Sequence, residues 1–226
     1  MLINDDLTQP VVVHAGKMDW IPSPAAGVDR RMLFRIGDEV ARATSIVRYA
    51  PDSAFPRHVH KGGEEILVLD GVFEDEHGTY PAGSYFRNPP GTSHVPAAKV
   101  GCTIFVRLWQ FRENDLMQIV RKPGEGQHMT PRPGASSSLL LFQDAHEKIS
   151  LEDWTTNAQV TLPNPDGLEI LVVRGGLRIG DEQLERQSWC RLPAGHELRA
   201  TVGPEGATVW VREAALLHAD APKLPN

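Results

Sequence analysis

In its first half the chain reads His58-Val59-His60-Lys61-Gly62-Gly63-Glu64, and a Pro-Gly turn precedes a third histidine in Pro89-Pro90-Gly91-Thr92-Ser93-His94. Side chains alternate along a strand, so histidines at positions i and i+2 point to the same face. Three imidazoles and one carboxylate that converge from β-structure make a ligand set for a divalent transition metal. We therefore predict a metal site whose ligands are His58, His60, Glu64 and His94.

The spacing of these residues follows two linked motifs, H-x-H-x(3,4)-E-x(6)-G and G-x(5)-P-x-G-x(2)-H. Gly71 closes the first motif and Gly83 opens the second, so every fixed position is matched. This pair of motifs resembles that of the cupins, whose fold is a jelly-roll barrel. The resemblance implies a chain built of β-structure.

A diverged internal repeat divides the chain into two halves. A shift of 104 positions without gaps places Glu65-Ile66-Leu67-Val68 on Glu169-Ile170-Leu171-Val172, and it also places Gly71 on Gly175. The turn-forming and core-forming positions therefore persist in both halves. The four candidate ligands do not persist, because the same shift replaces them with Leu162, Asn164, Leu168 and Leu198. We predict one metal site per chain, in the first half, and a second half that keeps the scaffold alone.

The repeat also separates Glu64 from Glu65, since the first motif permits either of them as the acidic ligand. Glu65 has a counterpart in Glu169, within the half that lacks these histidines, so we expect its role to be independent of a metal. Glu64 changes to leucine together with the histidines. It also shares their strand face if the register continues through the Gly62-Gly63 turn. We therefore predict Glu64 as the ligand.

Short strand-like runs separated by Gly, Pro and Asp clusters occupy most of the chain, and no amphipathic helix is evident. This pattern is typical of sandwiches and barrels. We predict an all-β fold of two tandem cupin (jelly-roll) barrels, a bicupin. Its parts are a metal-binding domain at 1–112, a linker rich in proline and glycine at 113–134, and a degenerate domain at 135–226. The predicted strands are Thr44–Tyr49, Glu64–Leu69, Ser84–Arg87, Cys102–Phe111, Leu139–Phe142, Leu168–Arg174, Trp189–Leu192 and Ala207–Arg212.

The composition excludes several classes of protein. The 226 residues are 41% hydrophobic and 23% charged, as in ordinary globular proteins. A net charge of −6 argues against nucleic-acid binding, which uses a basic surface. The apolar runs are strand-sized and the N-terminus lacks the pattern of a signal peptide, so we expect no membrane span and a cytoplasmic location. The two cysteines, Cys102 and Cys190, fit neither a disulfide framework nor a thiolate zinc site.

A wider match extends beyond the metal motifs. The segments Arg48-Tyr49-Ala50-Pro51, Phe55-Pro56-Arg57-His58, 71–78, 80–85 and Gly101-Cys102 resemble the cupin domain of ChrR, a zinc-dependent anti-sigma factor, over roughly residues 10–112. The resemblance implies that the four predicted ligands hold zinc, with Fe(II), Mn or Ni as alternative metals. ChrR-type proteins inhibit their sigma factor through a separate N-terminal helical domain with the pattern H-x(3)-C-x(2)-C. This sequence does not contain that pattern, so we do not expect a sigma factor as its partner.

Three functions are compatible with these residues. The first is a regulatory module in which a small molecule or an oxidant acts at the metal and changes a partner surface, as the resemblance to ChrR implies. The second is an enzyme, a cupin-type metal-dependent dioxygenase or hydrolase, since related cupins cleave β-diketones with Fe(II) at open coordination positions. The third is a structural site, because four protein ligands complete tetrahedral zinc. The sequence does not choose the coordination number, so whether the protein is an enzyme stays open.

The ligand set also predicts what the site binds. An ionised Glu64 beside three neutral imidazoles leaves a positive shell around a divalent cation, which favours a small anionic or diketone-like molecule. Ile66 and Val68, on the same strand face as Glu64, predict an apolar cavity around it. The run Ile66-Leu67-Val68-Leu69 is apolar on both faces, which predicts packing against the second half or against another subunit of a homo-oligomer.

Other candidate residues each allow two interpretations. Four aromatic residues either line a ligand pocket or belong to the core: Tyr85, Phe86, Phe105 and Trp109. Arg48 and Arg107 either hold an anionic ligand inside the barrel or point outward. Cys102, in an apolar strand, is expected to be a small buried hydrophobe. Six further histidines lack partners at ligand spacing, and we expect none of them to bind the metal: His14, His77, His128, His146, His196 and His218.

Overall fold

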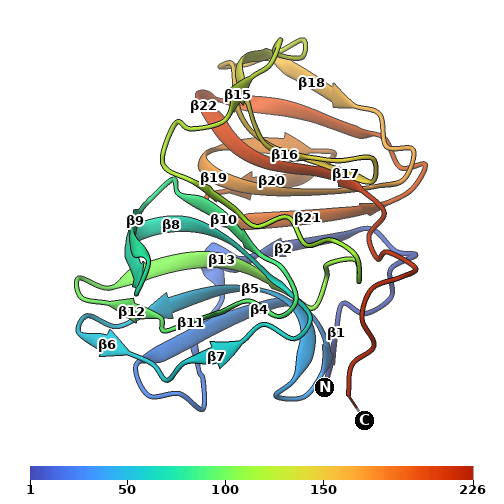
Figure 1. The fold of residues 1–226 in the computed structure, drawn as a ribbon. Coiled ribbons are helices and arrows are strands. Elements are labelled where there is room, and N and C mark those ends of the chain that lie inside the picture. The colour runs from blue at the N-terminus through green and yellow to red at the C-terminus, as the bar shows by residue number, and fades with distance from the viewer. Residues whose placement is uncertain (226) are drawn as a thin grey trace. The chain divides into compact units, whose positions relative to one another are not determined.

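Antiparallel strands account for nearly all the regular structure in the computed structural model, which describes residues 1–225 (Figure 1). They form two units. Unit 1 consists of Met1–Asp5, Asp19–Gly124 and the residues from Leu217 onward, whereas unit 2 consists of Asp6–Met18 and Glu125–Leu216. The only helical element in the described residues is a short 3-10 turn, η1 (Ala15–Lys17). The all-β prediction is confirmed.

Unit 1 contains a large antiparallel sheet and a small one. Its strands are β1 (Leu2–Ile3), β3 (Ile21–Pro22), β4 (Val28–Gly37), β5 (Ala41–Tyr49), β6 (Ser53–Ala54), β7 (His58–Val59), β8 (Glu64–Asp75), β9 (Gly78–Pro81), β10 (Tyr85–Asn88), β11 (Ser93–His94), β12 (Ala97–Ala98), β13 (Cys102–Leu108) and β14 (Ile119–Arg121). The main path of the eleven-stranded sheet runs β1-β4-β5-β13-β8-β10-β14. β7 and β11 form the two-stranded sheet, which carries two of the predicted ligands.

Unit 2 repeats the same arrangement in one nine-stranded sheet. Its strands are β2 (Val11–His14), β15 (Gln127–His128), β16 (Ala135–Gln143), β17 (Glu147–Trp154), β18 (Gln159–Leu162), β19 (Gly167–Ile179), β20 (Glu182–Glu185), β21 (Ser188–Pro193) and β22 (Leu198–Ala214). The main path runs β15-β16-β17-β22-β19-β21-β2. The central pair β19–β22 corresponds to β8–β13 of unit 1, because Glu169 pairs with Arg212 as Glu65 pairs with Arg107.

A glycine bends the long central strand of each unit at the same place. Gly71 in β8 and Gly175 in β19 have φ angles of +67° and +70°, which L-residues with a side chain rarely adopt. A Cβ at Gly71 would lie 2.1 Å from the carbonyl oxygen of Gly101, and one at Gly175 would lie 2.0 Å from that of Gly206. The glycine that the internal repeat retains is therefore required by the close approach of the next strand.

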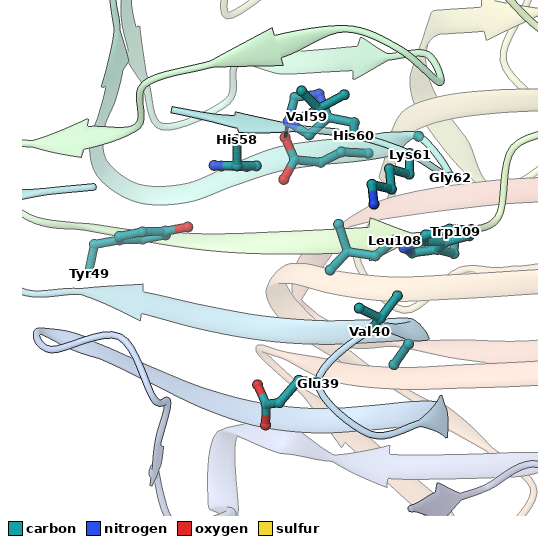
Figure 2. Close-up of a pocket in the computed structure, with 13 residues that line it drawn as sticks. Glu39, Val40, Tyr49, His58, Val59, His60, Lys61, Gly62, Leu108 and Trp109 are labelled. Atoms are coloured by element: carbon teal, nitrogen blue, oxygen red, sulfur yellow. Dashed lines mark ion pairs between the residues drawn. The ribbon is translucent and has the colours of Figure 1, made fainter. Parts of the chain in front are cut away.

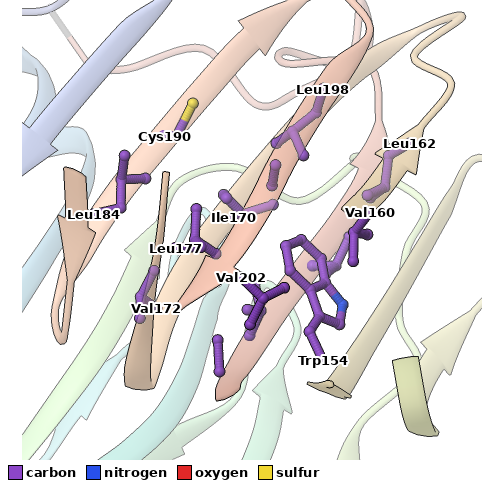
Figure 3. Packing of buried hydrophobic residues seen from close by; sticks show 14 of the residues in the cluster. Trp154, Val160, Leu162, Ile170, Val172, Leu177, Leu184, Cys190, Leu198 and Val202 are labelled. Atoms are coloured by element: carbon purple, nitrogen blue, oxygen red, sulfur yellow. The ribbon is translucent and has the colours of Figure 1, made fainter. Parts of the chain in front are cut away.

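Each unit has its own hydrophobic core. In unit 1, Ile66 and Val68 of β8 are 1% exposed and pack in a cluster with Phe73, Phe86 and Ile104. In unit 2 a larger cluster fills the space between the strands, as Figure 3 shows around Trp154, Ile170 and Val202. Cys102 and Cys190 are buried, free thiols in these clusters, in agreement with the apolar role expected for Cys102.

The strand predictions agree with the structure more closely than the predicted domain ranges do. Each of the eight predicted runs overlaps a strand, although Cys102–Phe111 ends early, at Leu108. The ranges 1–112 and 135–226 need adjustment, because β2 pairs with β21 of unit 2 and the residues from Leu217 belong to unit 1. The predicted linker, 113–134, contains β14 and β15, which pair with β10 and β16. It is therefore not free of regular structure.

No helix within residues 1–225 has the length and apolar character needed to cross a membrane.

Candidate metal centre

Two short strands and one turn position the predicted ligands in unit 1. His58 of β7 lies directly opposite His94 of β11 in the antiparallel register. His60 follows β7, and its backbone is held by the Pro-Gly turn: its N–H donates to the carbonyl of Thr92 (2.9 Å) and its carbonyl accepts from Gly91 (3.0 Å). The chain then turns, and Glu64 opens β8. The turn thus brings Glu64 to the same side as the three histidines.

The four donor groups converge on one point. One ligand atom from each of His58, His60, Glu64 and His94 lies within 4.8 Å of the others. Glu64 Oε2 is 3.2 Å from His60 Nε2 and 3.5 Å from His94 Nε2. Both Nε2 atoms are buried and make no hydrogen bond. Buried nitrogen lone pairs without a donor are costly, and a cation between them and the carboxylate would satisfy them. The residues therefore fit a divalent metal.

Oxygen acceptors orient the imidazoles. The Thr92 hydroxyl donates its single hydrogen to the Pro89 carbonyl (2.7 Å), so it accepts a hydrogen bond from His60 Nδ1 (2.9 Å). This contact fixes the His60 tautomer with Nδ1 protonated and the Nε2 lone pair facing the cluster. His94 Nδ1 lies 3.4 Å from a carboxylate oxygen of Asp75 without a hydrogen bond to it, so the contact with this carboxylate is electrostatic. Such partners of metal-binding histidines set ring orientation and ligand basicity.

Burial lowers the pKa values of the three histidines and raises the pKa of Glu64. Burial, with the neighbouring His94 and His58, lowers the pKa of His60 to about 3. Burial and His58 lower the pKa of His94 to about 4, and burial also lowers that of His58. Burial raises the pKa of Glu64 to about 7, although the hydrogen bond from Asn88 (3.2 Å) acts in the other direction. At neutral pH the imidazoles are therefore neutral, the form that binds metals.

Two glycines shape the turn between His60 and Glu64. A Cβ at Gly62 would lie 2.2 Å from the indole of Trp109, and one at Gly63 would lie 2.3 Å from the ring of Phe111. Trp109 itself has a left-handed φ of 58°, which is rare for a residue with a side chain. The turn and the end of β13 therefore pack too closely for larger residues.

The metal cluster forms part of the wall of an open pocket of about 400 Å³ in unit 1. His58, His60 and Glu64 line it on one side, and Figure 2 shows Glu39, Val40, Leu108 and Trp109 around the rest of it. Lys61 adds a cationic group. The cluster is thus reached from a pocket of ligand size rather than closed by protein on all sides.

The structure decides between the two interpretations of several residues. Trp109 lines the pocket, whereas Phe86 and Phe105 are buried and Tyr85 donates its hydroxyl to Glu65. Neither arginine lines it. Arg107 is buried against Glu65 (2.6 Å), and Arg48 pairs with Asp29 (2.6 Å) while half exposed. Glu65 therefore lies away from the metal cluster.

None of the six remaining histidines joins the cluster. His14 lies near Ser188 and Glu182, at 3.3 and 3.1 Å. His218 is buried, and the other four are exposed: His77, His128, His146 and His196. Among residues 1–225, the group of metal-ligand type is the one formed by His58, His60, Glu64 and His94.

In unit 2 the positions of the ligands are occupied by a packed core. Leu162, Leu168 and Leu198 are at most 1% exposed and belong to one hydrophobic cluster. Figure 3 shows Leu162 and Leu198 in it. Asn164, which replaces His60, donates its amide to the carbonyls of Leu192, Pro193 and His196 at 3.2, 2.7 and 3.1 Å. The second unit therefore has apolar packing and a hydrogen-bonded turn where unit 1 has the four predicted ligands.

Tyr49 is among the pocket residues that the sequence predictions missed. It is the last residue of β5 and lines the pocket together with His58 and Glu64. The available signal was strand parity, since Val47 and Tyr49 share the face that packs on the core of unit 1.

Comparisons with known proteins agree with this geometry. The sequence model of the ChrR cupin-like domain matches residues 8–112. No curated protein gives a significant match. The fold is similar to that of a Nostoc punctiforme protein described as a candidate dioxygenase, with a TM-score of 0.72, 14% identity, and coverage of 97% of this chain and 87% of that one.

Two Escherichia coli structures are also similar in fold. Ylba has a TM-score of 0.68 at 12% identity, covering 92% of both chains. The bacterial pirin YhhW in complex with nickel(II) has a TM-score of 0.66 at 12% identity, covering 92% of this chain and 99% of that one. Identities this low show likeness of fold alone, and the likeness spans nearly the whole chain. This chain is thus a bicupin of two jelly-roll barrels, and its residues 8–112 match the model of the ChrR cupin-like domain.

Proposed function

We propose that this protein binds one divalent transition-metal ion through His58, His60, Glu64 and His94, and that the ion binds a small anionic or diketone-like molecule in the adjoining pocket. The observation that carries the proposal is the position of the donor cluster in the wall of an open pocket of about 400 Å³. A purely structural metal is normally enclosed by its ligands, whereas a functional one faces an accessible space.

The ligand set fits this role chemically. Three neutral imidazoles and one carboxylate leave a net positive charge on a divalent cation, so an anion completes the site favourably. The cation would act as a Lewis acid toward an oxygen of the bound molecule. Lys61 adds a positive charge to the pocket, while Val40, Leu108 and Trp109 offer apolar surface to the rest of the molecule.

Zinc is our first choice for the metal because of the ChrR cupin-like family, with Fe(II), Mn and Ni as alternatives. The nickel(II) in the similar fold of YhhW supports a divalent metal in general and not one element.

We assign the site a regulatory role, in which a small molecule or an oxidant at the metal changes a partner surface. The family match supports this role, since ChrR is an anti-sigma factor. The proposal names no protein as the partner. The homo-oligomer, the absence of nucleic-acid binding and the cytoplasmic location stay predictions.

A cupin-type dioxygenase is the second candidate. It is favoured by the open pocket beside the four donors and by the likeness of fold to the Nostoc punctiforme protein. An octahedral metal with four protein ligands keeps two positions for substrate and O₂. Oxygen consumption by Fe(II)-loaded protein in the presence of diketones separates the two candidates, because a regulatory module would bind them without turnover.

The proposal is tested first by elemental analysis of protein purified without an affinity-tag metal. One cation per chain is expected, and the double variant His58→Ala/His94→Ala should lose it. Two cations per chain, or full occupancy of the double variant, would contradict the assignment. Titration with small anions then compares metal-loaded and metal-stripped protein. Equal weak affinity of both forms would reduce the metal to a structural role.

A further inference from the structure

Tyr49 differs from the other two tyrosines of this chain in the use of its hydroxyl. Tyr80 donates its hydroxyl to Asp75 (3.1 Å) and Tyr85 donates to Glu65 (3.0 Å). The Tyr49 hydroxyl makes no hydrogen bond to any described residue, although its ring is largely covered. Tyr49 is half-buried, and its hydroxyl faces the pocket rather than another side chain. The hydroxyl is therefore available to a molecule that enters the pocket.

The ring of Tyr49 is held in one orientation. It makes edge-to-face contacts with Phe55 and Phe73, at centroid distances of 5.1 and 5.9 Å. Its backbone lies opposite Cys102 in the β5–β13 pairing. Figure 2 shows the hydroxyl end pointing into the pocket that His58 and Glu64 also line. Burial near Glu64 raises the pKa of this phenol well above its usual range, so the group is a hydrogen-bond donor at all ordinary pH values.

Unit 2 provides an internal comparison for this position. Tyr49 ends β5 opposite Cys102, and Trp154 ends β17 opposite Ala207, the counterpart of Cys102. Trp154 is 2% exposed, packs in the core and donates its indole N–H to Glu152 (2.8 Å). In the unit without metal ligands, the polar group at this position is thus satisfied inside the protein. In unit 1, which has the predicted ligands, the Tyr49 hydroxyl stays available to a bound molecule.

We infer that Tyr49 is a binding residue for the molecule held at the metal centre, and that this molecule carries two oxygen functions. One oxygen reaches the cation, and the Tyr49 hydroxyl donates a hydrogen bond to the molecule on its pocket side. Diketones and oxo-carboxylates have this chemistry, whereas a ligand whose only acceptor is taken up by the metal does not. The inference rests on the proposed function, and it adds the residue that selects among ligands.

Tyr49→Phe tests the inference, because it removes the hydroxyl and keeps the ring contacts with Phe55 and Phe73. The protein is loaded with Co(II), whose visible absorption changes when a ligand enters, and titrated with two probes. Acetylacetone offers two oxygens, and 1-methylimidazole binds a metal through one nitrogen and has no acceptor left. We expect the variant to bind acetylacetone about tenfold more weakly and 1-methylimidazole with unchanged affinity. Tyr85→Phe, whose hydroxyl bonds to Glu65, is the matched control and should leave both affinities unchanged.

The outcomes separate the two proposals. Equal affinity of wild type and Tyr49→Phe for acetylacetone, at equal metal content, would overturn the role of Tyr49 and leave the proposed function intact. An equal loss for both probes would also overturn it, because a general distortion of the site would then explain the effect. Failure of the metal-loaded wild type to bind either probe would overturn the proposed function and the role of Tyr49 together.

Discussion

Glu64 and Glu65 are neighbours in the chain but have opposite surroundings. Glu64 lies among three imidazoles, and Asn88 donates a hydrogen bond to it. Glu65 is paired with Arg107 and accepts the Tyr85 hydroxyl. Unit 2 repeats the second arrangement: Glu169 contacts Arg212 (3.3 Å) and accepts the indole N–H of Trp189 (3.2 Å). Because this buried pair exists in the unit without metal ligands, it belongs to the scaffold.

Glutamine substitutions at these two positions are expected to have opposite effects. Glu65→Gln leaves the buried Arg107 without its counter-charge, so it should lower the free energy of unfolding by about 3 kcal/mol and still allow one metal per chain. Glu64→Gln removes a carboxylate whose burial is unfavourable, so metal-stripped protein should stay as stable while metal affinity falls. Denaturant unfolding and elemental analysis measure the two quantities. The assignment of roles is wrong if Glu65→Gln loses the metal and Glu64→Gln keeps it.

The pKa values predict a shallow pH dependence of metal binding. The imidazoles of His60 and His94 are neutral down to about pH 4, so a cation does not have to displace their protons at pH 5 to 7. Glu64, with its pKa raised to about 7, is increasingly protonated as the pH falls below 7, and binding must then release one proton. The proton on Glu64 alone should therefore make metal affinity fall about tenfold per pH unit between pH 6.5 and 5.

Calorimetry in buffers of different ionisation enthalpy measures this proton release. We expect close to one proton per cation at pH 5.5 and almost none at pH 8.5. In Glu64→Gln the pH dependence should disappear in this range. Release of two or three protons at pH 5.5 would mean that the imidazoles are protonated in the metal-free protein.

Sequence reasoning brought together the four donor residues because motif spacing and strand parity are local properties. The structure places them within reach of each other, and their role as ligands stays a proposal. The expected strand register through Gly62 and Gly63 is not what brings Glu64 into place, since β7 ends at Val59 and a turn precedes β8. Tyr49 was missed because nothing in its sequence neighbourhood shows that its hydroxyl lacks a partner. That property depends on which side chains of distant strands surround it.

Strands with an apolar face could be predicted from the sequence, whereas strands that depend on pairing with a neighbour could not. The eight predicted runs are apolar on at least one face, as in β8 and β19. β4 was missed although it is ten residues long, because four of its residues are charged: Asp29, Arg30, Arg31 and Arg35. It is a strand because β5 supplies its hydrogen bonds from Val28 to Gly37. Tertiary pairing of this kind leaves no signal in the strand's own sequence.

The tight turn after His60 predicts that the substitution Gly62→Ala lowers both stability and metal affinity. Gly62→Ala places a Cβ 2.2 Å from the Trp109 indole, and one of the two must move. We expect the free energy of unfolding to fall by about 1–3 kcal/mol and metal affinity to fall with it, because the turn connects His60 to Glu64. Thermal unfolding and metal titration measure both.

A second substitution identifies the cause of this effect. Trp109→Ala in the Gly62→Ala background should restore part of the stability, with a coupling energy of about 1 kcal/mol or more. Additive effects of the two substitutions would show that the contact between turn and indole is not what makes Gly62 necessary.

Each unit of the molecule is completed by a segment from the far end of the chain. β2 joins unit 2 through pairing with β21, and the residues from Leu217 join unit 1. Hydrogen bonds of the C-terminal segment include one from Arg42 to the carbonyl of Pro222 (2.9 Å) and one from the Glu113 N–H to the carbonyl of Asp220 (3.1 Å). Arg42 also donates to the carbonyl of Trp109 (2.9 Å), which lines the pocket.

A chain that ends at Leu216 should therefore have a less stable unit 1. Two hydrogen bonds contribute about 2 kcal/mol together, which corresponds to a fall in Tm of about 4–8 °C. Differential scanning calorimetry measures the change. A chain in which residues 217–226 are replaced by a Gly/Ser sequence of equal length separates the contacts from chain length and should behave like the deletion. An unchanged Tm in both would mean that the segment does not stabilise the unit.

β2 and the residues from Leu217 each belong to the unit at the other end of the sequence, and this limits the order in which the two units can fold during synthesis. His14 of β2 emerges from the ribosome 174 positions before Ser188, its partner in β21. At about 5–20 residues per second, β2 waits roughly 10–35 s for that strand. The residues from Leu217 that complete unit 1 follow every residue of unit 2 in the sequence. Unit 1 can therefore reach its final form only after all residues of unit 2 have been translated.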